Sequence, residues 1–204
     1  MEDIVKQALA KWPNVPACTG WLGMDARGQW WMRDAACQAR GSFQAGCAAS
    51  DVGMKGSLLK HEKLIAFIQR NYGVDAQGQA WFQNGPQRVF VELEAAPYCL
   101  RLHEDGCITT TAGNSSSDNG AQTINAIDSA WLDENGHLYL AFANTSALTL
   151  GRVHSQDMLL ALAAIENGQL PQPQESAGVD LQNRFAYRLS PEANAQGEVS
   201  AARH

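Results

Sequence analysis

The run ACTGWLGMDARGQWWM, at residues 17–32, carries a strong local signal for a chain reversal. Apolar segments at 17–24 and 29–32 flank the tetrapeptide DARG at 25–28. An Asp side chain accepts hydrogen bonds from its own turn, and Gly supplies the positive φ that a tight reversal requires. The run therefore predicts a β-hairpin.

The same turn signal recurs further along the chain. DAQG at 75–78 precedes the apolar segment QAWF, and HEDG at 103–106 is another candidate turn. DENG at 133–136 lies between apolar segments at 127–132 and 137–142. These positions predict further antiparallel hairpins.

Two helices are predicted between the hairpins. Ser57 is a suitable N-cap for a helix at 58–72, which Gly73 would end, and Ser155 is a suitable cap for a helix at 156–167. A hairpin followed by a helix thus occurs twice. We expect an α+β fold of two subdomains with repeated hairpin or sheet-plus-helix motifs and antiparallel strands.

The sequence also predicts the structure of the terminal segments and of one long connection. The apolar alternation at 184–189 predicts a late strand, the polar run at 114–120 a surface loop, and the chain beyond Pro191 disorder. The expected units are an N-terminal helix and linker at 1–16, a first α+β subdomain at 17–86, a second at 87–170, and a partly disordered C-terminal extension at 171–204.

The charge and the cysteine content limit the classes of function that the protein is expected to have. The 204 residues hold 15 Lys plus Arg against 21 Asp plus Glu, a net charge of −6, which argues against general nucleic-acid binding. No export signal or membrane span is apparent, so a soluble cytoplasmic protein with no membrane partner is expected. No C-x-x-C pair occurs, and no metal or cofactor is expected. The five cysteines, expected to be reduced thiols, are Cys18, Cys37, Cys47, Cys99 and Cys107.

A family resemblance rests on three segments: LLKHEKLIAF at 58–67, the DAQG turn at 75–78 and VFVELEAAPY at 89–98. Together they resemble the bacterial domain-of-unknown-function family 1285, over about a quarter of the chain. The resemblance implies a two-part α+β fold with repeated sheet-and-helix motifs, no established chemistry, and a role in signalling or ligand sensing. The sequence departs from the family pattern at Ala95, where the family has Asp, and in a longer cysteine-containing connector at 33–55.

His61 and the tryptophans are the first candidate binding residues. On the predicted helix His61 lies on the apolar stripe, so it is a satisfied core histidine, a pocket-lining residue or a metal ligand. Trp30 and Trp31 are adjacent in a strand and must face opposite sides, so one enters the core while the other lies near a surface, groove or interface. Trp81 follows the second hairpin turn.

Arg88 and Arg101 are the remaining candidates. On neighbouring strands they would grip a carboxylate or phosphate through their forked donors, or would pair across strands with Glu92 or Glu94. No Ser/His/Asp, Cys/His or paired-carboxylate arrangement assembles, so no catalytic residue is assigned.

We expect a non-catalytic ligand-sensing or protein-interaction module with a signalling role. It is expected to form a homo-oligomer through its exposed aromatic residues or through its charge asymmetry, since residues 1–73 are basic and 74–204 acidic. The alternative is a small-molecule enzyme with its site in the cleft between the subdomains. The candidate ligand-binding residues are His61, Trp30, Trp31, Trp81, Arg88 and Arg101.

Overall fold

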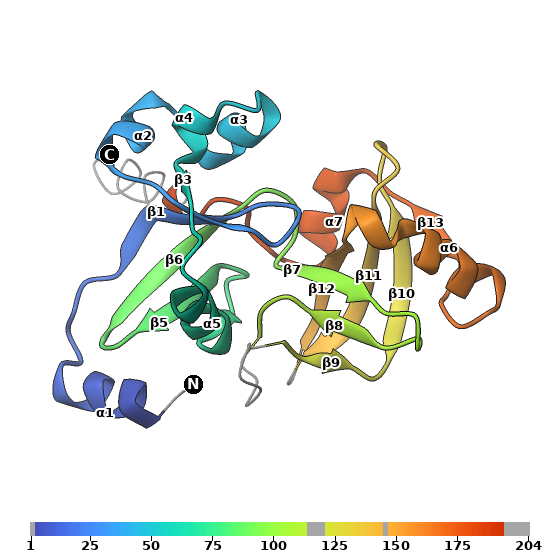
Figure 1. The fold of residues 1–204 in the computed structure, drawn as a ribbon, viewed down its shortest axis with the longest axis horizontal. Helices are drawn as coiled ribbons and strands as arrows, with labels where there is room; N and C mark the ends of the chain where they lie inside the picture. Colours follow the sequence, from blue (N-terminus) through green and yellow to red (C-terminus); the bar gives the residue numbers. More distant parts are fainter. Residues whose placement is uncertain (1–2, 114–120, 145–146, 194–204) are drawn as a thin grey trace.

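The computed structural model describes residues 3–113, 121–144 and 147–193, and it folds as two mixed β-sheets with helices packed around them (Figure 1). The predicted α+β class is confirmed. The predicted loop at 114–120 and the predicted disorder from residue 194 onward lie outside the described residues.

The first sheet is built around the 17–32 hairpin. In spatial order its strands are β3 (Ser57–Leu58), β2 (Trp30–Met32), β1 (Cys18–Met24), β6 (Gln87–Leu93), β5 (Ala80–Asn84) and β4 (Tyr72–Val74). The hairpin predicted at 75–78 joins β4 and β5, and β1 and β6 pair in parallel while the other neighbours are antiparallel.

The second sheet contains the hairpins predicted at 103–106 and 133–136. In spatial order its strands are β13 (Pro173–Glu175), β10 (Ile127–Leu132), β11 (Leu138–Asn144), β12 (Ala147–Val153), β7 (Tyr98–Leu102), β8 (Ile108–Thr110) and β9 (Thr123–Ile124). Its parallel pairs are β10 with β13 and β12 with β7. The chain passes from the first sheet to the second between Leu93 and Tyr98; the division into subdomains at 17–86 and 87–170 stays a prediction.

The helices lie mostly in the connections. The connector at 33–55 folds into three short helices, capped by Asp34, Ser42 and Asp51, that lie above the first sheet in Figure 1. No helix within the described ranges is long and apolar enough to cross a membrane. The helices are α1 (Asp3–Lys11), α2 (Ala35–Arg40), α3 (Phe43–Ala48), α4 (Val52–Lys55), α5 (Glu62–Arg70), the 3-10 turn η1 (Ser155–Asp157), α6 (Met158–Glu166) and α7 (Gly178–Arg184).

The helix predicted at 58–72 is shorter than expected at both ends. Ser57 does not cap it, because Ser57 and Leu58 pair with β2 as strand β3. His61 is the cap instead, and its Nδ1 accepts a hydrogen bond from the Leu64 amide at 3.2 Å. At the other end Tyr72 leaves the helix to begin β4, where its ring is buried in the core.

Two later expectations also need correction. The helix predicted at 156–167 begins as the turn η1, which His154 caps, before α6 follows. The strand predicted at 184–189 does not form, because α7 runs to Arg184 and Ala186 adopts a positive φ of 49°. What remains of the strand is a single parallel bridge between Gln79 and Arg188.

The core runs without interruption from one sheet to the other. Edge-to-face ring contacts link Trp30 to Tyr72, Tyr72 to Tyr98 and Tyr98 to Phe142, with centroids 5.8, 5.7 and 5.5 Å apart. Each such contact adds about 0.5–1.5 kcal/mol to the burial of the rings. The two sheets are therefore held in one fixed relation, which matters because the candidate site lies between their loops.

Candidate functional site

Two adjoining hollows lie where loops of the two sheets meet. One, of about 490 Å³, is at the 25–28 turn and is called the Asp25 lobe; the other, of about 350 Å³, is at the 133–136 turn and is called the Asp133 lobe. Cys47, Glu94 and Arg152 line both, so the two lobes form one cleft around these three side chains.

The turn that follows β1 positions Asp25. Its Oδ1 accepts hydrogen bonds from the Arg27 and Gln29 amides at 3.0 and 2.9 Å, and Gly28 completes the reversal with a φ of 74°. Its Oδ2 accepts the Trp31 indole N–H at 3.0 Å. The Asp predicted to stabilise the hairpin therefore also orients Trp31 at the edge of the cleft.

Glu94 reaches the same place from the end of β6. Because β1 and β6 are parallel neighbours, their carboxyl ends meet, and Glu94 Oε2 accepts the Ala26 amide at 2.9 Å. Lys55, at the end of α4, places its Nζ 3.7 Å from Asp25 Oδ2 and 3.9 Å from Glu94 Oε2. The same ammonium lies 4.6 Å from the centroid of the Trp31 ring, a cation–π distance. Lys55 is thus held between two carboxylates and an aromatic face.

Cys47 faces both lobes but is a poor nucleophile. Burial and the nearby Glu94 carboxylate raise the pKa of the Cys47 thiol to about 12. Since the thiolate is the reactive form of cysteine, Cys47 is protonated and unreactive at neutral pH.

Arg152 is a half-buried cation of the cleft that has no ion-pair partner among the described residues. It lies half-buried on β12, opposite Tyr139 of β11 and Cys99 of β7, and within the described residues its guanidinium makes no hydrogen bond and no ion pair. Arg101 of β7, by contrast, forms a two-pronged ion pair with Asp157 at 2.6 and 3.1 Å. Removing an arginine from water without a partner is unfavourable, so the Arg152 guanidinium is available to an anion.

The Asp133 lobe repeats the turn chemistry of the Asp25 lobe. Asp133 Oδ1 accepts the Asn135 and His137 amides, and its Oδ2 lies 2.8 Å from His137 Nδ1 and accepts the Tyr139 hydroxyl at 3.1 Å. Burial alone would raise the pKa of Asp133, but the hydrogen bonds from His137 and Asn135 outweigh burial and lower it. Asp133 is therefore ionised at neutral pH, and both of its oxygens are occupied.

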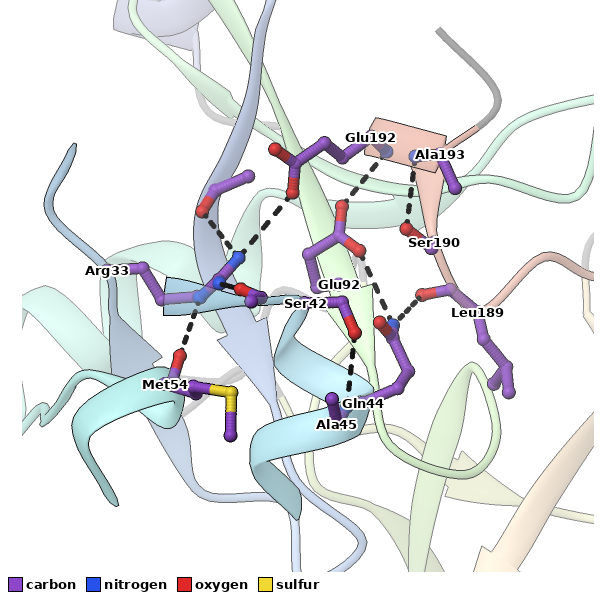
Figure 2. A network of polar contacts seen from close by, with 12 residues as sticks. Arg33, Ser42, Gln44, Ala45, Met54, Glu92, Leu189, Ser190, Glu192 and Ala193 are labelled. Atoms are coloured by element: carbon purple, nitrogen blue, oxygen red, sulfur yellow. Dashed lines mark hydrogen bonds and ion pairs between the residues drawn. The ribbon is translucent and has the colours of Figure 1, made fainter. Parts of the chain in front are cut away.

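A buried polar network holds the wall of the Asp133 lobe in place (Figure 2). Glu92 is 0% exposed, and its carboxylate accepts the Glu192 amide at 3.0 Å and lies 3.4 Å from Gln44 Nε2. Gln44 also donates to the Leu189 carbonyl at 2.9 Å. Burial raises the pKa of Glu92. These bonds fasten the C-terminal segment that carries Leu189, and Leu189 lines the lobe.

Arg33 anchors the other side of this network. The side chain is 1% exposed and donates to the carbonyls of Met54, Gly20 and Gly41, and its guanidinium lies 3.5 Å from Glu192. Figure 2 shows the ion pair between Arg33 and Glu192. The network ties the α2–α4 connector to the C-terminal segment and reaches the wall of the Asp133 lobe at Gln44 and Leu189, so it supports the cleft.

One of the residues predicted for ligand binding, Trp31, lies at the cleft. Its neighbour Trp30 is buried in the core, as strand alternation requires. Trp81 is half-buried with the Arg88 guanidinium 4.2 Å above its ring, away from either lobe. Arg101 is paired with Asp157 and also lies outside both lobes.

The prediction that His61 lies on the apolar stripe of a helix is wrong. The helix begins after it, so the side chain is an exposed cap and not part of the apolar stripe. Ligand binding by any of the six candidate residues stays a prediction. Within the described ranges, no three His, Cys, Asp or Glu side chains gather closely enough to hold a metal ion.

Sequence reasoning missed Arg152, Lys55 and Glu94. Arg152 did leave a signal, because it is a charged residue in the apolar strand segment ALTLGRV. No short-range pattern in the sequence indicates Lys55 or Glu94, because Glu94 comes close to the 25–28 turn only through the parallel pairing of β1 with β6.

Comparisons with known proteins identify a family and no activity. No curated protein matches the chain. Among solved structures, the chain is similar to the crystal structure of a DUF1285 family protein from Shewanella baltica OS155, with a TM-score of 0.41 and 11% identity over 71% of this chain and 91% of that one. That protein belongs to the family that residues 56–102 resemble. Residues 1–200 match a different family, designated DUF2944 and described as "Protein of unknown function (DUF2946)", and the chain belongs to that family.

Proposed function

We propose that this protein is a non-catalytic sensing module that binds a small anionic molecule in the cleft between its two sheets, with Arg152 as the principal anion contact. The observation that carries the proposal is the half-buried Arg152 guanidinium, which faces both lobes and has no partner within the described residues. A guanidinium matches the geometry of carboxylate and phosphate groups through two parallel hydrogen bonds.

The charge around the Asp25 lobe supports anion binding. The cations Arg27, Lys55 and Arg152 line it against two carboxylates, Asp25 and Glu94, so the lobe is net positive in a chain whose net charge is −6. Local positive potential concentrates anions in a cleft even when the whole protein is acidic.

Three of the reactive groups in the cleft, Cys47, Asp25 and Asp133, are poorly suited to catalysis. The Cys47 thiol is protonated at neutral pH, and the oxygens of Asp25 and Asp133 are taken up by their own turns and by Trp31, His137 and Tyr139. A general base or nucleophile needs a free atom facing the substrate. The alternative, a small-molecule enzyme using the same cleft, predicts that a bound ligand is converted; a sensor returns it unchanged.

Binding is tested with two probes, inorganic phosphate and hexanoate, at constant ionic strength. Weak binding is measured as shifts of the tryptophan indole signals in NMR spectra of the ¹⁵N-labelled protein, with Trp31 assigned from a Trp31→Phe variant. We expect the Trp31 signal to move on titration of at least one probe. Arg152→Gln should abolish this shift, and Lys63→Gln, which removes an exposed cation on α5 outside both lobes, should leave it unchanged.

The proposal fails if neither probe moves the Trp31 signal, or if Arg152→Gln binds as well as the parent. The expected homo-oligomer, protein partner and cytoplasmic location are separate predictions, and none of them enters this test.

A further inference from the structure

We infer that the ligand of this cleft is bipolar, with an anionic group at one end and an ammonium or similar hydrogen-bond donor at the other. This inference rests on the proposed function and adds the chemical class of the ligand. It follows from the way in which hydrogen-bond donors and acceptors divide between the two lobes.

The Asp25 lobe offers donors. Among the described residues, the side chains of Arg27 and Arg152 make no hydrogen bond, and the Lys55 ammonium lies at ion-pair distances of 3.7 and 3.9 Å that leave its N–H groups without a close acceptor. Arginine and lysine carry donors and no acceptors. The Asp25 carboxylate is occupied by its turn and by Trp31. Glu94 also lines this lobe and accepts the Ala26 amide through Oε2, so two carboxylates stand against three cations.

The Asp133 lobe offers acceptors. Glu134 accepts the Gly178 amide through Oε2 at 2.8 Å, and its other oxygen has no partner within the described residues. The Tyr139 hydroxyl donates its hydrogen to Asp133, which leaves the Tyr139 oxygen as an acceptor. Tyr187 likewise donates to the Ala95 carbonyl at 3.1 Å and presents an accepting oxygen.

The net charge changes sign between the lobes. Charged residues around the Asp133 lobe are Arg152 against Glu94, Asp133 and Glu134, whereas cations outnumber carboxylates around the Asp25 lobe. His137 also faces the Asp133 lobe, and its Nδ1 is held on Asp133. A simple anion satisfies Arg152 but gains nothing from Glu134, whereas a molecule with a cationic end satisfies both lobes.

Amino acids with separated charges, amine-bearing phosphates and short basic peptides all carry this combination. What they share is an anion and an ammonium joined by a short spacer. The distance between the two ends of the cleft selects the spacer length, so a ladder of ω-amino acids measures it.

The test compares three compounds of one chain length with the full chain: hexanoate, 6-aminohexanoate and hexylamine. Glycine and 4-aminobutanoate extend the ladder to shorter spacers. Dissociation constants are measured from the Trp31 indole signal at constant ionic strength. We expect at least one ω-amino acid to bind about tenfold tighter than the simple carboxylate of its length, a gain typical of one added charge-assisted hydrogen bond.

Two variants locate the two ends. Glu134→Gln keeps an oxygen for the Gly178 amide but removes the charge, so it should cancel the preference for the ω-amino acid and leave hexanoate binding unchanged. Glu166→Gln, at an exposed position on α6, is the matched control and should preserve the preference. Arg152→Gln should weaken both classes of probe.

The outcomes separate this inference from the proposed function. If hexanoate binds through Arg152 and no ω-amino acid binds more tightly, the bipolar ligand is refuted while anion binding stands. If an ω-amino acid is preferred equally by the parent and by Glu134→Gln, the assigned acceptor is wrong and the inference falls. If no probe of either class binds, both proposals fail.

Discussion

Gly78→Ala, compared with Gly136→Ala, tests whether the C-terminal segment is docked as the structure shows. Both glycines sit in an Asp-x-x-Gly turn with the same φ of 76°. A Cβ at Gly136 would meet no atom within 4 Å, whereas a Cβ at Gly78 would lie 1.8 Å from the Ala186 carbonyl oxygen. The two substitutions therefore introduce the same backbone strain, but only Gly78→Ala also introduces a clash with the Ala186 carbonyl oxygen.

The magnitudes follow from these contacts. A left-handed backbone conformation costs an alanine about 1–2 kcal/mol, which is the whole effect expected for Gly136→Ala. Gly78→Ala must in addition displace the chain at Ala186, which breaks the hydrogen bond from the Arg188 amide to the Gly78 carbonyl and disturbs Tyr187, 4% exposed. One hydrogen bond and part of a buried aromatic side chain amount to about 2–3 kcal/mol more.

Equilibrium urea unfolding, followed by tryptophan fluorescence, measures both variants against the parent. We expect Gly78→Ala to lose about 3–5 kcal/mol of unfolding free energy and Gly136→Ala about 1–2 kcal/mol. Equal losses in the two variants would show that the segment around Ala186 does not pack on the 75–78 turn, and the docking described above would then be wrong.

Three further predictions concern buried polar groups. Arg33→Met leaves three carbonyl oxygens without their donor and should lower the unfolding free energy, measured in urea, by about 3–5 kcal/mol. The control Arg88→Met, at an exposed position, should lower it by less than about 1 kcal/mol. Similar losses in the two variants would contradict the Arg33 network. The pKa of Asp133 is lowered in the folded state, so the stability that its carboxylate contributes is complete above the unfolded pKa of about 3.9 and is lost as the pH falls through the folded pKa. Asp133→Asn should therefore lose less unfolding free energy on acidification than the parent. Parallel curves of unfolding free energy against pH for the two proteins would exclude this role. Cys47, with its pKa of about 12, should resist iodoacetamide at pH 7.5 in the native protein and react in urea, as peptide mass spectrometry would show; rapid native alkylation would contradict its protected state.

The turns were predictable because their chemistry is local. At 25–28, 75–78 and 133–136 the Asp side chain bonds to amides two and four residues ahead, and the Gly adopts a positive φ. These interactions depend on no distant partner, so the tetrapeptides alone indicate them. The α+β class and the hairpins follow from the same local information.

Local signals failed where a distant partner competed for the same residues. Ser57 has the chemistry of a helix cap, but pairing with β2 takes it into β3 and moves the cap to His61. The alternation at 184–189 has the period of a strand, but the residues complete α7 and then dock on the 75–78 turn. In both places tertiary contacts outweighed local propensity.

The amino-acid sequence by itself determined the hairpins, their Asp and Gly residues, the fold class, and the placement of Trp30 and Trp31 on opposite faces of one strand. The tertiary structure alone decided the cleft. Ala26 and Glu94 are 68 residues apart and meet because β1 pairs in parallel with β6, and Arg152 joins them because the continuous aromatic core holds the second sheet against the first. Such meetings are set by long-range pairing, which the pattern of neighbouring residues does not encode.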